Sequence, residues 1–417
     1  MNQLIPFSKQ TIRMNTSNYK LILGLFLSLL LFSCDQEDVN NEPSFDYVVS
    51  YEFVETVTEE EIEARFGNDP LVVDIINFDV DAYTLTYNTM NYDNSMVEAS
   101  GLVLIPKVSG KVKLTSFQHS TLAKDPDPQI DQENRAPSYL SPDNAEVYLS
   151  AFLYASNGYL ISAADYIGYG STKELFHPYE HAQTAATTSF DMLRAAKELG
   201  TFLEVEMVSK TYLMGYSQGG NSTMALHKYM EENNLTEEFP IAKSAMGAGA
   251  YHKSAVGNYI FNFEGDLGFP ISLYLWVMDS YDKVYPELQN GLSYYLKEPY
   301  ATEVIENGYF AISSSNPQTV FTDQFINDIN NPSSAFSQAL ADNNIHNWRA
   351  EAPIKLYHHI DDELVPYFNS EDALAAMNAM GSTDVTLETY NFTTIDGNVH
   401  GTAGARYFQD VLLGFFR

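Results

Sequence analysis

The chain has 417 residues, of which 45% are hydrophobic and 18% are charged, so it is long enough for one large domain or two ordinary ones with a sizeable core. Acidic side chains outnumber basic ones by 55 to 22, which gives a formal net charge of -33. This balance argues against nucleic-acid binding, because phosphates require a basic face. The chain contains one cysteine, Cys34, which excludes an intramolecular disulfide and a zinc site built from several thiolates.

The N-terminal segment has the pattern of an export signal. Residues 21–32 form an apolar run that only Gly24 and Ser28 interrupt, and the basic residues Lys9, Arg13 and Lys20 precede it. A run of about 12 residues is too short to cross a membrane comfortably but fits the core of a secretory signal. We therefore predict a signal peptide over residues 1–33, followed by a polar tether over 34–44.

The single cysteine lies directly after this apolar run. The sequence Leu31-Phe32-Ser33-Cys34 resembles the bacterial lipobox, in which cleavage before the cysteine exposes it for lipidation. The resemblance implies an exported protein that is anchored by a lipid on Cys34 to a bacterial membrane, the outer membrane or the cell surface. The alternative is a plain signal peptide with an incidental cysteine. The sequence leaves the periplasmic or outward orientation and the oligomeric state open.

Strands and helices alternate along most of the remaining chain. An antiparallel hairpin is expected around the polar turn at 91–94, because alternating apolar residues flank it. Further strands are expected at 113–118, 159–164, 212–214, 241–246, 354–358 and 385–390, with helices at about 181–199, 224–230 and 403–415. This order predicts an α/β fold with a mostly parallel sheet.

One insertion breaks the alternation. Residues 251–349 show no strand–helix rhythm and carry a cluster of large apolar residues between Tyr259 and Met278. We expect a mostly helical cap over an apolar pocket, with Phe269 and Trp276 among the lining residues, and core segments at 45–250 and 350–417. The alternative is a set of extra helices packed on the edge of the sheet.

A candidate nucleophile stands in the only G-x-S-x-G of the chain. Gly215 and Gly219 flank Ser217, a short expected strand precedes the motif and an expected helix follows it. Glycines at these two positions permit the sharp turn that exposes a serine hydroxyl at the edge of a sheet. The alternative is an ordinary glycine-rich turn between a strand and a helix.

The order of the chain selects the partners of Ser217. A serine hydroxyl needs a base, and in hydrolases with this turn the acid follows the nucleophile and the histidine comes last. His400 is the histidine that lies beyond every plausible acid, in a loop before the closing helix. The acid is expected at the end of the strand at 354–358, where the Asp-x-x-Val-Pro spacing favours Asp362 and leaves Asp361 as the second choice.

Two backbone amides are expected to stabilise an oxyanion. One belongs to Gln218, directly after the nucleophile, and the other to the loop after the strand at 113–118. We assign the second donor to Ser120, with Thr121 as the alternative. The acidic loop at 125–131 is a possible calcium ligand, although a solvated loop is the simpler interpretation.

These segments together resemble the α/β-hydrolase superfamily and, within it, the secretory lipase group. The resemblance covers about residues 80–417 and rests on the segments at 100–106, 117–121, 165–170, 215–220 and 362–366. It implies an α/β-hydrolase fold with a helical cap inserted before the strand that carries the catalytic acid, carboxylic ester hydrolysis, and neither a cofactor nor a metal. Ser120 departs from the glycine that many relatives have at this place.

The expected function is therefore a serine lipase or esterase that acts on a small-molecule, lipid or acylated ester substrate through an acyl-enzyme. Two rivals remain: a peptidase of the same fold, and a surface binding lipoprotein with a vestigial site. The acyl chain length and the alcohol of the substrate are not readable from the sequence.

Overall fold

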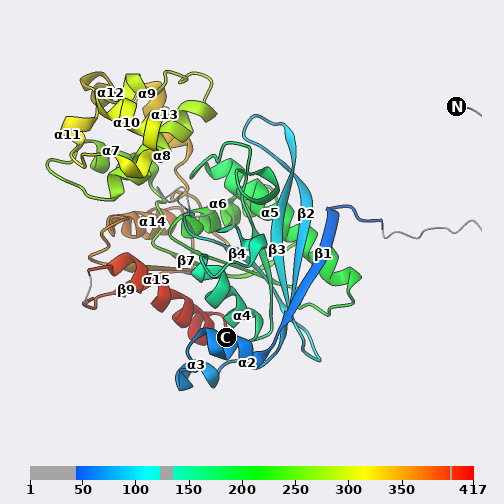
Figure 1. The fold of residues 1–417 in the computed structure, drawn as a ribbon. Coiled ribbons are helices and arrows are strands. Elements are labelled where there is room, and N and C mark those ends of the chain that lie inside the picture. Colours follow the sequence, from blue (N-terminus) through cyan, green and yellow to red (C-terminus); the bar gives the residue numbers. More distant parts are fainter. Residues whose placement is uncertain (1–43, 123–134, 395–396) are drawn as a thin grey trace, which may run out of the picture. The chain divides into compact units, whose positions relative to one another are not determined.

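A computed structural model describes residues 44–122, 135–394 and 397–417. In this part of the chain a single sheet has nine strands in the order β1-β2-β3-β5-β4-β6-β7-β8-β9 (Figure 1). The strands are β1 (Val48–Val57), β2 (Val80–Met90), β3 (Met96–Pro106), β4 (Lys113–Gln118), β5 (Tyr159–Ala164), β6 (Thr211–Tyr216), β7 (Ile241–Gly247), β8 (Ile354–His359) and β9 (Val385–Tyr390).

The sheet begins antiparallel and continues parallel. β1, β2, β3 and β5 pair in antiparallel fashion, whereas β5, β4, β6, β7, β8 and β9 pair in parallel. The first three strands form a twisted ribbon at one side, visible in blue and cyan in Figure 1. The predicted α/β-hydrolase architecture, with an early hairpin and a mostly parallel sheet, is confirmed.

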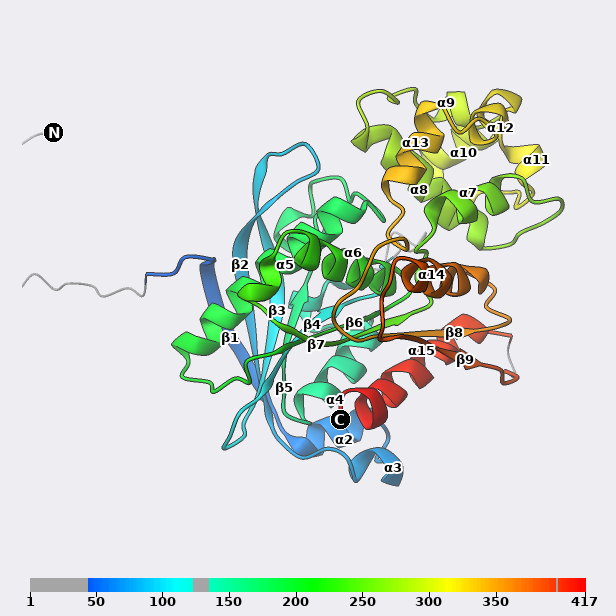
Figure 2. The same cartoon turned by 180° about the vertical axis from the view of Figure 1, so that it is seen from behind.

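Helices cover both faces of the sheet (Figure 2). On one face, α5 (Ala182–Phe202) and α6 (Gln218–Glu232) bury Met192, Leu193, Leu226 and Met230 against the strands. On the other face, α4 (Phe152–Ala155) and α15 (Val399–Asp410) bury Phe152, Tyr407 and Phe408. The π-helical segments η3 (Glu146–Ala151) and η7 (Val411–Phe415) extend this layer. Such burial of parallel strands on both faces explains their near-continuous apolar sequences.

The remaining core elements are short or peripheral. They are α2 (Glu59–Arg65), α3 (Pro70–Val73), η2 (Pro137–Tyr139), η4 (Gly170–Thr172), η5 (Leu235–Glu237) and α14 (Phe368–Ala379). The α2 helix starts with a capping box, in which Thr58 and Glu61 satisfy each other's backbone amides. Of the helices in the described residues, none combines the length and hydrophobicity that a membrane crossing requires.

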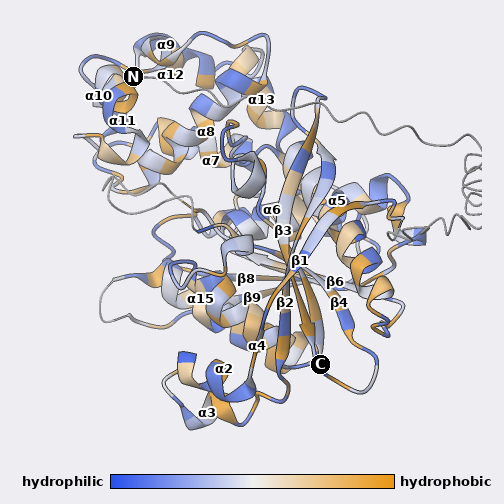
Figure 3. Cartoon of the chain, turned by 45° about the vertical axis from the view of Figure 1, so that its right-hand side comes forward, coloured by the Kyte–Doolittle hydropathy of each residue, from blue (hydrophilic) through white to orange (hydrophobic). Residues whose placement is uncertain are grey.

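A helical insertion separates β7 from β8. It contains α7 (Lys253–Phe261), α8 (Pro270–Val284), α9 (Leu292–Tyr295), α10 (Tyr300–Asn307), η6 (Tyr309–Ala311), α11 (Pro317–Val320), α12 (Asp323–Ile329) and α13 (Ala335–Asp342). These helices carry hydrophobic and hydrophilic residues side by side, as amphipathic helices do (Figure 3). Their apolar faces enclose a separate core around Phe261, Leu275, Phe325 and Phe336. The insertion therefore has its own packing and stands before the strand that leads to Asp362.

The turn between β6 and α6 leaves no room for side chains at its glycines. A Cβ atom on Gly219 would lie 2.1 Å from the Gln118 carbonyl oxygen, and one on Gly220 would lie 2.3 Å from the Gly247 carbonyl oxygen. Separations this short are forbidden to carbon and oxygen atoms, so α6 packs this close to β4 and β7 only with glycine at both positions. The close packing places the N-terminus of α6 at the carboxyl edge of the sheet.

Candidate active site

Ser217 forms the corner between β6 and α6. Its backbone has φ 58° and ψ -122°, a conformation that costs a non-glycine residue about 1–3 kcal/mol. Two backbone bonds hold the corner: the Ser217 N–H donates to the Gly247 carbonyl (2.9 Å), and the Ser217 carbonyl accepts from the Asn221 N–H (3.0 Å). The strained turn predicted from the glycine spacing is therefore present at Ser217.

Ser217 opens into a cavity of about 420 Å³. Its polar lining includes Ser120, Thr121, Glu146 and His400, and its apolar lining includes Leu149, Phe269, Leu273 and Phe408. Phe269 and Leu273 come from the helical insertion, so this segment contributes part of the wall, as expected. A cavity with a few convergent polar groups in apolar surroundings is the usual form of a small-molecule site.

The expectation for Trp276 is wrong, because the indole is not part of the cavity wall in the described residues. It stacks on Tyr179 at a centroid distance of 4.2 Å and an interplanar angle of 8°, and on Tyr309 at 5.9 Å and 15°. This aromatic column joins α8 to the loop before α5 and to η6. Trp276 therefore packs the insertion onto the core.

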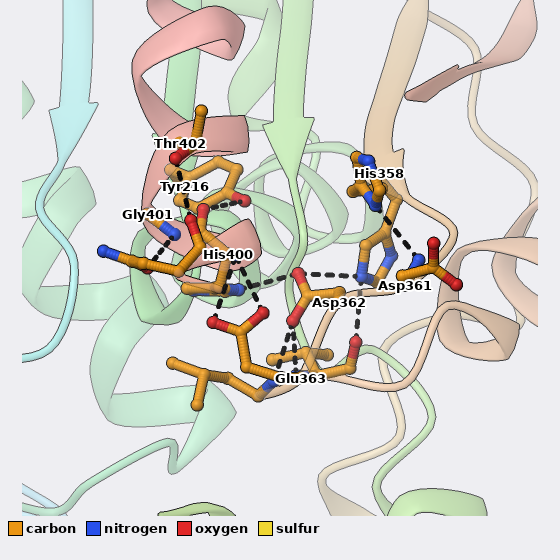
Figure 4. Close-up of polar contacts among 12 residues, drawn as sticks. Tyr216, His358, Asp361, Asp362, Glu363, His400, Gly401 and Thr402 are labelled. Atoms are coloured by element: carbon orange, nitrogen blue, oxygen red, sulfur yellow. Dashed lines mark hydrogen bonds and ion pairs between the residues drawn. The ribbon is translucent and has the colours of Figure 1, made fainter. Parts of the chain in front are cut away.

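Asp362 and His400 meet at the carboxyl ends of β8 and β9 (Figure 4). His400 Nδ1 donates to Asp362 Oδ2 at 2.7 Å, and the side chain of Asp362 is fully buried. The Leu364 and Val365 amides donate to Asp362 Oδ1, each at 2.9 Å. Asp361 instead lies exposed on the turn. The structure thus places Asp362, and not its neighbour, against the imidazole.

A second imidazole approaches the same carboxylate. His358 Nε2 lies 3.3 Å from Asp362 Oδ2 and 3.0 Å from the Val365 carbonyl oxygen, while its Nδ1 contacts the Ser370 hydroxyl at 2.8 Å. Burial raises the pKa of Asp362, but the His400 and His358 imidazoles outweigh burial and hold the pKa well below its usual range. Asp362 is therefore ionised at every physiological pH.

The backbone of His400 is also fixed. Its N–H donates to the Glu363 carboxylate at 3.0 Å, and its carbonyl accepts from the Tyr216 hydroxyl at 2.8 Å. Asn398 caps the helix that begins here by accepting from the Gly401 N–H at 2.9 Å. These bonds tie His400 to the residue before the nucleophile and to the residue after the acid. Among the described residues no hydrogen bond joins Ser217 Oγ to His400, although both line the cavity.

Gln218 is the first residue of α6, where backbone amides have no partner within the helix. Its side-chain Nε2 lies 3.0 Å from His177 Nε2. Burial lowers the pKa of His177 to about 3, so the imidazole is neutral and accepts from the Gln218 amide group. The contact with His177 holds the Gln218 side chain, and the Gln218 backbone amide lies at the N-terminus of α6.

Ser120 is held on two sides. Its hydroxyl donates to the Tyr216 carbonyl at 2.8 Å, next to the nucleophile, and its N–H donates to Glu146 Oε2 at 2.9 Å. Burial raises the pKa of Glu146 to about 7. The predicted oxyanion donor therefore lies in the cavity with its amide bonded to a carboxyl group.

Three residues of the site were not found from the sequence: Glu146, His358 and Glu363. His358 had a signal, since it stands four residues before Asp362 in an expected strand. Glu146 had none, because it lies in no motif and reaches Ser120 only through the fold.

Four predictions from the sequence lie outside the described residues: the signal peptide at 1–33, the tether at 34–44 except for Ser44, the lipidation site Cys34 and the acidic loop at 125–131. In the described residues no group of His, Cys, Asp or Glu is arranged to hold a metal ion.

The sequence and the structure were both compared with those of known proteins. The family model described as Secretory lipase matches residues 144–400. The rice cell wall degrading esterase LipA from Xanthomonas oryzae has a similar structure, with a TM-score of 0.75, 23% identity, and coverage of 88% of this chain and 96% of LipA. A protein from Legionella pneumophila has a TM-score of 0.76 at 25% identity and covers 89% of this chain and 99% of its own.

A more distant structure shares the same fold. Lipase A from Candida antarctica has a TM-score of 0.59 and 16% identity, with coverage of 83% of this chain and 76% of the lipase. A search of curated proteins finds no match. Since the family model matches more than half of the sequence, the chain belongs to the secretory lipase family and is an α/β-hydrolase of the lipase and esterase type.

Proposed function

We propose that the protein is a serine carboxylic ester hydrolase that uses Ser217, His400 and Asp362 through an acyl-enzyme. The observation that carries the proposal is the 2.7 Å bond between Asp362 and His400 beside the cavity that exposes Ser217. A buried carboxylate on Nδ1 fixes the imidazole with Nε2 free to take a proton. The strained corner presents the serine hydroxyl at the same edge.

The reaction proceeds in two acyl transfers. His400 takes the proton of Ser217 as the oxygen attacks the ester carbonyl, and Asp362 stabilises the resulting imidazolium. The backbone amide of Gln218 stabilises the tetrahedral oxyanion. The Ser120 N–H, the second donor expected from the sequence, is bonded to Glu146 Oε2 in this structure. His400 then gives its proton to the leaving alcohol. Water repeats the sequence on the acyl-enzyme and releases the carboxylic acid.

The N-terminal segment and the family support a proposal for the cellular location. We propose export and lipidation of Cys34, with the enzyme anchored to the outer membrane or cell surface. A Cys34→Ser variant should leave the membrane fraction in cell fractionation, because it lacks the thiol that carries the lipid. Retention of the variant with the membranes would rule out the lipid as the anchor.

A fluorophosphonate probe tests the nucleophile. Labelling of the wild type should map to Ser217 and disappear in Ser217→Ala, while His400→Ala should react slower by several orders of magnitude because the serine loses its base. A wild type that no probe labels would favour a binding lipoprotein with a vestigial site. Cleavage of peptidyl anilides in preference to a panel of esters from acetate to palmitate would favour the peptidase.

The acid is tested by a matched pair of neighbours. Asp362→Asn should lower kcat by roughly 10³–10⁴-fold, because the amide stabilises the wrong imidazole tautomer and no imidazolium. Asp361→Asn, on the exposed side of the same turn, should stay within about threefold of the wild type. Steady-state kinetics on one soluble ester measures both. A larger loss in Asp361→Asn would refute the assignment.

The wall contributed by the insertion is tested by acyl chain length. Phe269→Ala should lower kcat/KM for a palmitate ester at least about tenfold more than for acetate, since each buried CH₂ group contributes about 0.8 kcal/mol. Ile305→Ala, an exposed position on α10, is the control and should leave the ratio unchanged. Equal losses on both esters would mean that Phe269 only packs the insertion.

A further inference from the structure

His358 is a fully buried histidine that the proposed mechanism does not use. It belongs to β8 and stands four residues before Asp362, the acid of the proposed triad. Its imidazole and that of His400 contact the same carboxylate from two sides (Figure 4). A Ser-His-Asp site needs one imidazole as its base, so a second imidazole on the acid requires an explanation.

The two ring nitrogens of His358 have different partners. Nε2 lies 3.0 Å from the Val365 carbonyl oxygen and 3.3 Å from Asp362 Oδ2. Both partners are acceptors when Asp362 is ionised, so Nε2 carries a proton and shares it between them. Nδ1 lies 2.8 Å from the hydroxyl of Ser370, in the first turn of α14, and a hydroxyl can donate. Both ring nitrogens are therefore satisfied when the imidazole is neutral.

A closed ring of hydrogen bonds fixes the Asp362 carboxylate. Oδ1 accepts the Leu364 and Val365 amides, each at 2.9 Å, and the Val365 carbonyl in turn accepts from His358. Rotation of the carboxylate about its Cβ–Cγ bond would break contacts at both oxygens at once. Oδ2 therefore stays directed at His400 Nδ1, which lies 2.7 Å away.

The two imidazoles do not bind Oδ2 equally. His400 lies at 2.7 Å, whereas His358 lies at 3.3 Å and shares its proton with a carbonyl oxygen. A long, shared hydrogen bond is weaker than a short one to a charged acceptor. His358 thus orients the carboxylate but leaves most of its negative charge for the imidazolium that forms on His400.

The surroundings of His358 favour a neutral ring. The titratable side chains in contact with it, as far as the structure describes the chain, are Asp362 and Tyr367, whose ring centroid lies 5.5 Å away. In the proposed mechanism Asp362 already faces the positive charge that His400 acquires. A second cation on a fully buried ring would repel this charge across one carboxylate and weaken the support that Asp362 gives it.

We propose that His358 is a positioning residue of the active site, a neutral imidazole whose Nε2–H holds the Asp362 carboxylate in the orientation that serves His400. It neither touches the substrate nor transfers a proton. The proposal rests on the proposed function and assigns one more residue to the same site. It also accounts for Ser370, because a hydroxyl that donates to Nδ1 keeps the ring proton on Nε2, where the carboxylate needs it.

Loss of the His358 donor should change the pH dependence of the reaction. The carboxylate then has one donor fewer, so it becomes a stronger partner of the His400 imidazolium and keeps the proton there to higher pH. Since His400 acts as the base only when it is neutral, the acid limb of the rate profile should move to higher pH by about half to one unit. A residue that only supports the fold would not move this limb.

The test compares His358→Gln with His358→Leu. Glutamine keeps a neutral N–H donor near the position of Nε2, whereas leucine keeps the bulk of the side chain but has no donor. Leucine should lower the plateau rate about 10–10²-fold and move the acid limb, and glutamine should restore the limb to its wild-type position. The rate is the second-order constant of fluorophosphonate labelling at Ser217, which requires no knowledge of the natural substrate. The extent of labelling counts the active sites, so a partly misfolded sample is not mistaken for a slow one.

The control is His227→Leu in α6. His227 is also fully buried and contacts a carboxylate, since its Nε2 lies 2.8 Å from Glu231 Oε1. It lies 10 residues, or about 15 Å, along the helix from Ser217. We expect this variant to lose thermal stability but to keep the wild-type acid limb. Glu146, whose pKa is raised by burial to about 7, lines the cavity in every variant, so the comparison uses shifts between variants and not absolute positions.

The outcomes separate the two proposals. An acid limb of His358→Leu at the wild-type position, or at lower pH, would overturn the role of His358 and leave the triad intact. A limb that moves equally in His358→Gln and His358→Leu would also overturn it, because a neutral donor would then not replace the imidazole. Absence of labelling in the wild type at every pH would overturn the proposed function and this role with it.

A measurement on the unmodified protein does not depend on the folding of variants. Nitrogen-15 NMR of selectively labelled histidine should show one protonated nitrogen in His358, Nε2, throughout the range of about pH 5–8 in which an ordinary histidine titrates. The signals are assigned by their absence from His358→Gln. A ring that carries protons on both nitrogens at neutral pH, or on Nδ1 alone, would contradict the proposal.

Discussion

The bond between Asp362 and His400 is the interaction on which the rest of the site depends. The Asp362 carboxylate is fully buried and would be unstable without partners. Two backbone amides bind its Oδ1, and the imidazoles of His400 and His358 bind its Oδ2. A buried charge is tolerated only with such complete pairing. His358 has further partners in Ser370 and Val365, so the carboxylate is part of a network that extends into α14. Loss of either imidazole would leave an under-compensated charge.

The parallel sheet brings the members of this site together. Ser217 follows β6, Asp362 follows β8 and His400 follows β9, and the carboxyl ends of parallel strands lie at one edge. The glycines after Ser217 let α6 approach β4 and β7 closely enough for the corner to form. Tyr216 links the corner to the rest, since its hydroxyl holds His400 and its carbonyl holds Ser120. Hydrogen bonds from β7, from the loop after β4 and from α15 thus hold Ser217 and Tyr216 in place, which maintains the strained backbone conformation of Ser217.

The sequence predicts those parts of the fold whose pattern is local. The strands at 113–118, 159–164 and 385–390 have the predicted bounds, because each is a short apolar or alternating run between turn residues. The sequence does not predict the edge strand β1 or the helix α14 as separate elements. β1 exposes most of its residues, and α14 buries small and polar ones such as Asn369, Ser370 and Ala373, so neither has a clear apolar period.

The residues of the candidate site likewise fall into those with a local sequence signal and those without one. Ser217, Asp362 and His400 could be assigned because a motif, a spacing and the chain order each constrain one of them. Glu146 and the position of Trp276 depend on which segments meet in space. Glu146 reaches the Ser120 amide across 26 residues, and Trp276 is held between two tyrosine rings from separate segments. Neither contact has a periodicity or a motif, so both required the structure.

The most direct test of the account is a proton NMR spectrum of the resting enzyme. A short bond from Nδ1 to a buried carboxylate strongly deshields its proton. We expect one far-downfield exchangeable signal that belongs to the Nδ1 proton of His400, disappears in His400→Ala and in Asp362→Asn, and persists in Asp361→Asn. A wild-type spectrum without this signal, or a signal that survives in Asp362→Asn, would contradict the claim that Asp362 holds His400 beside Ser217.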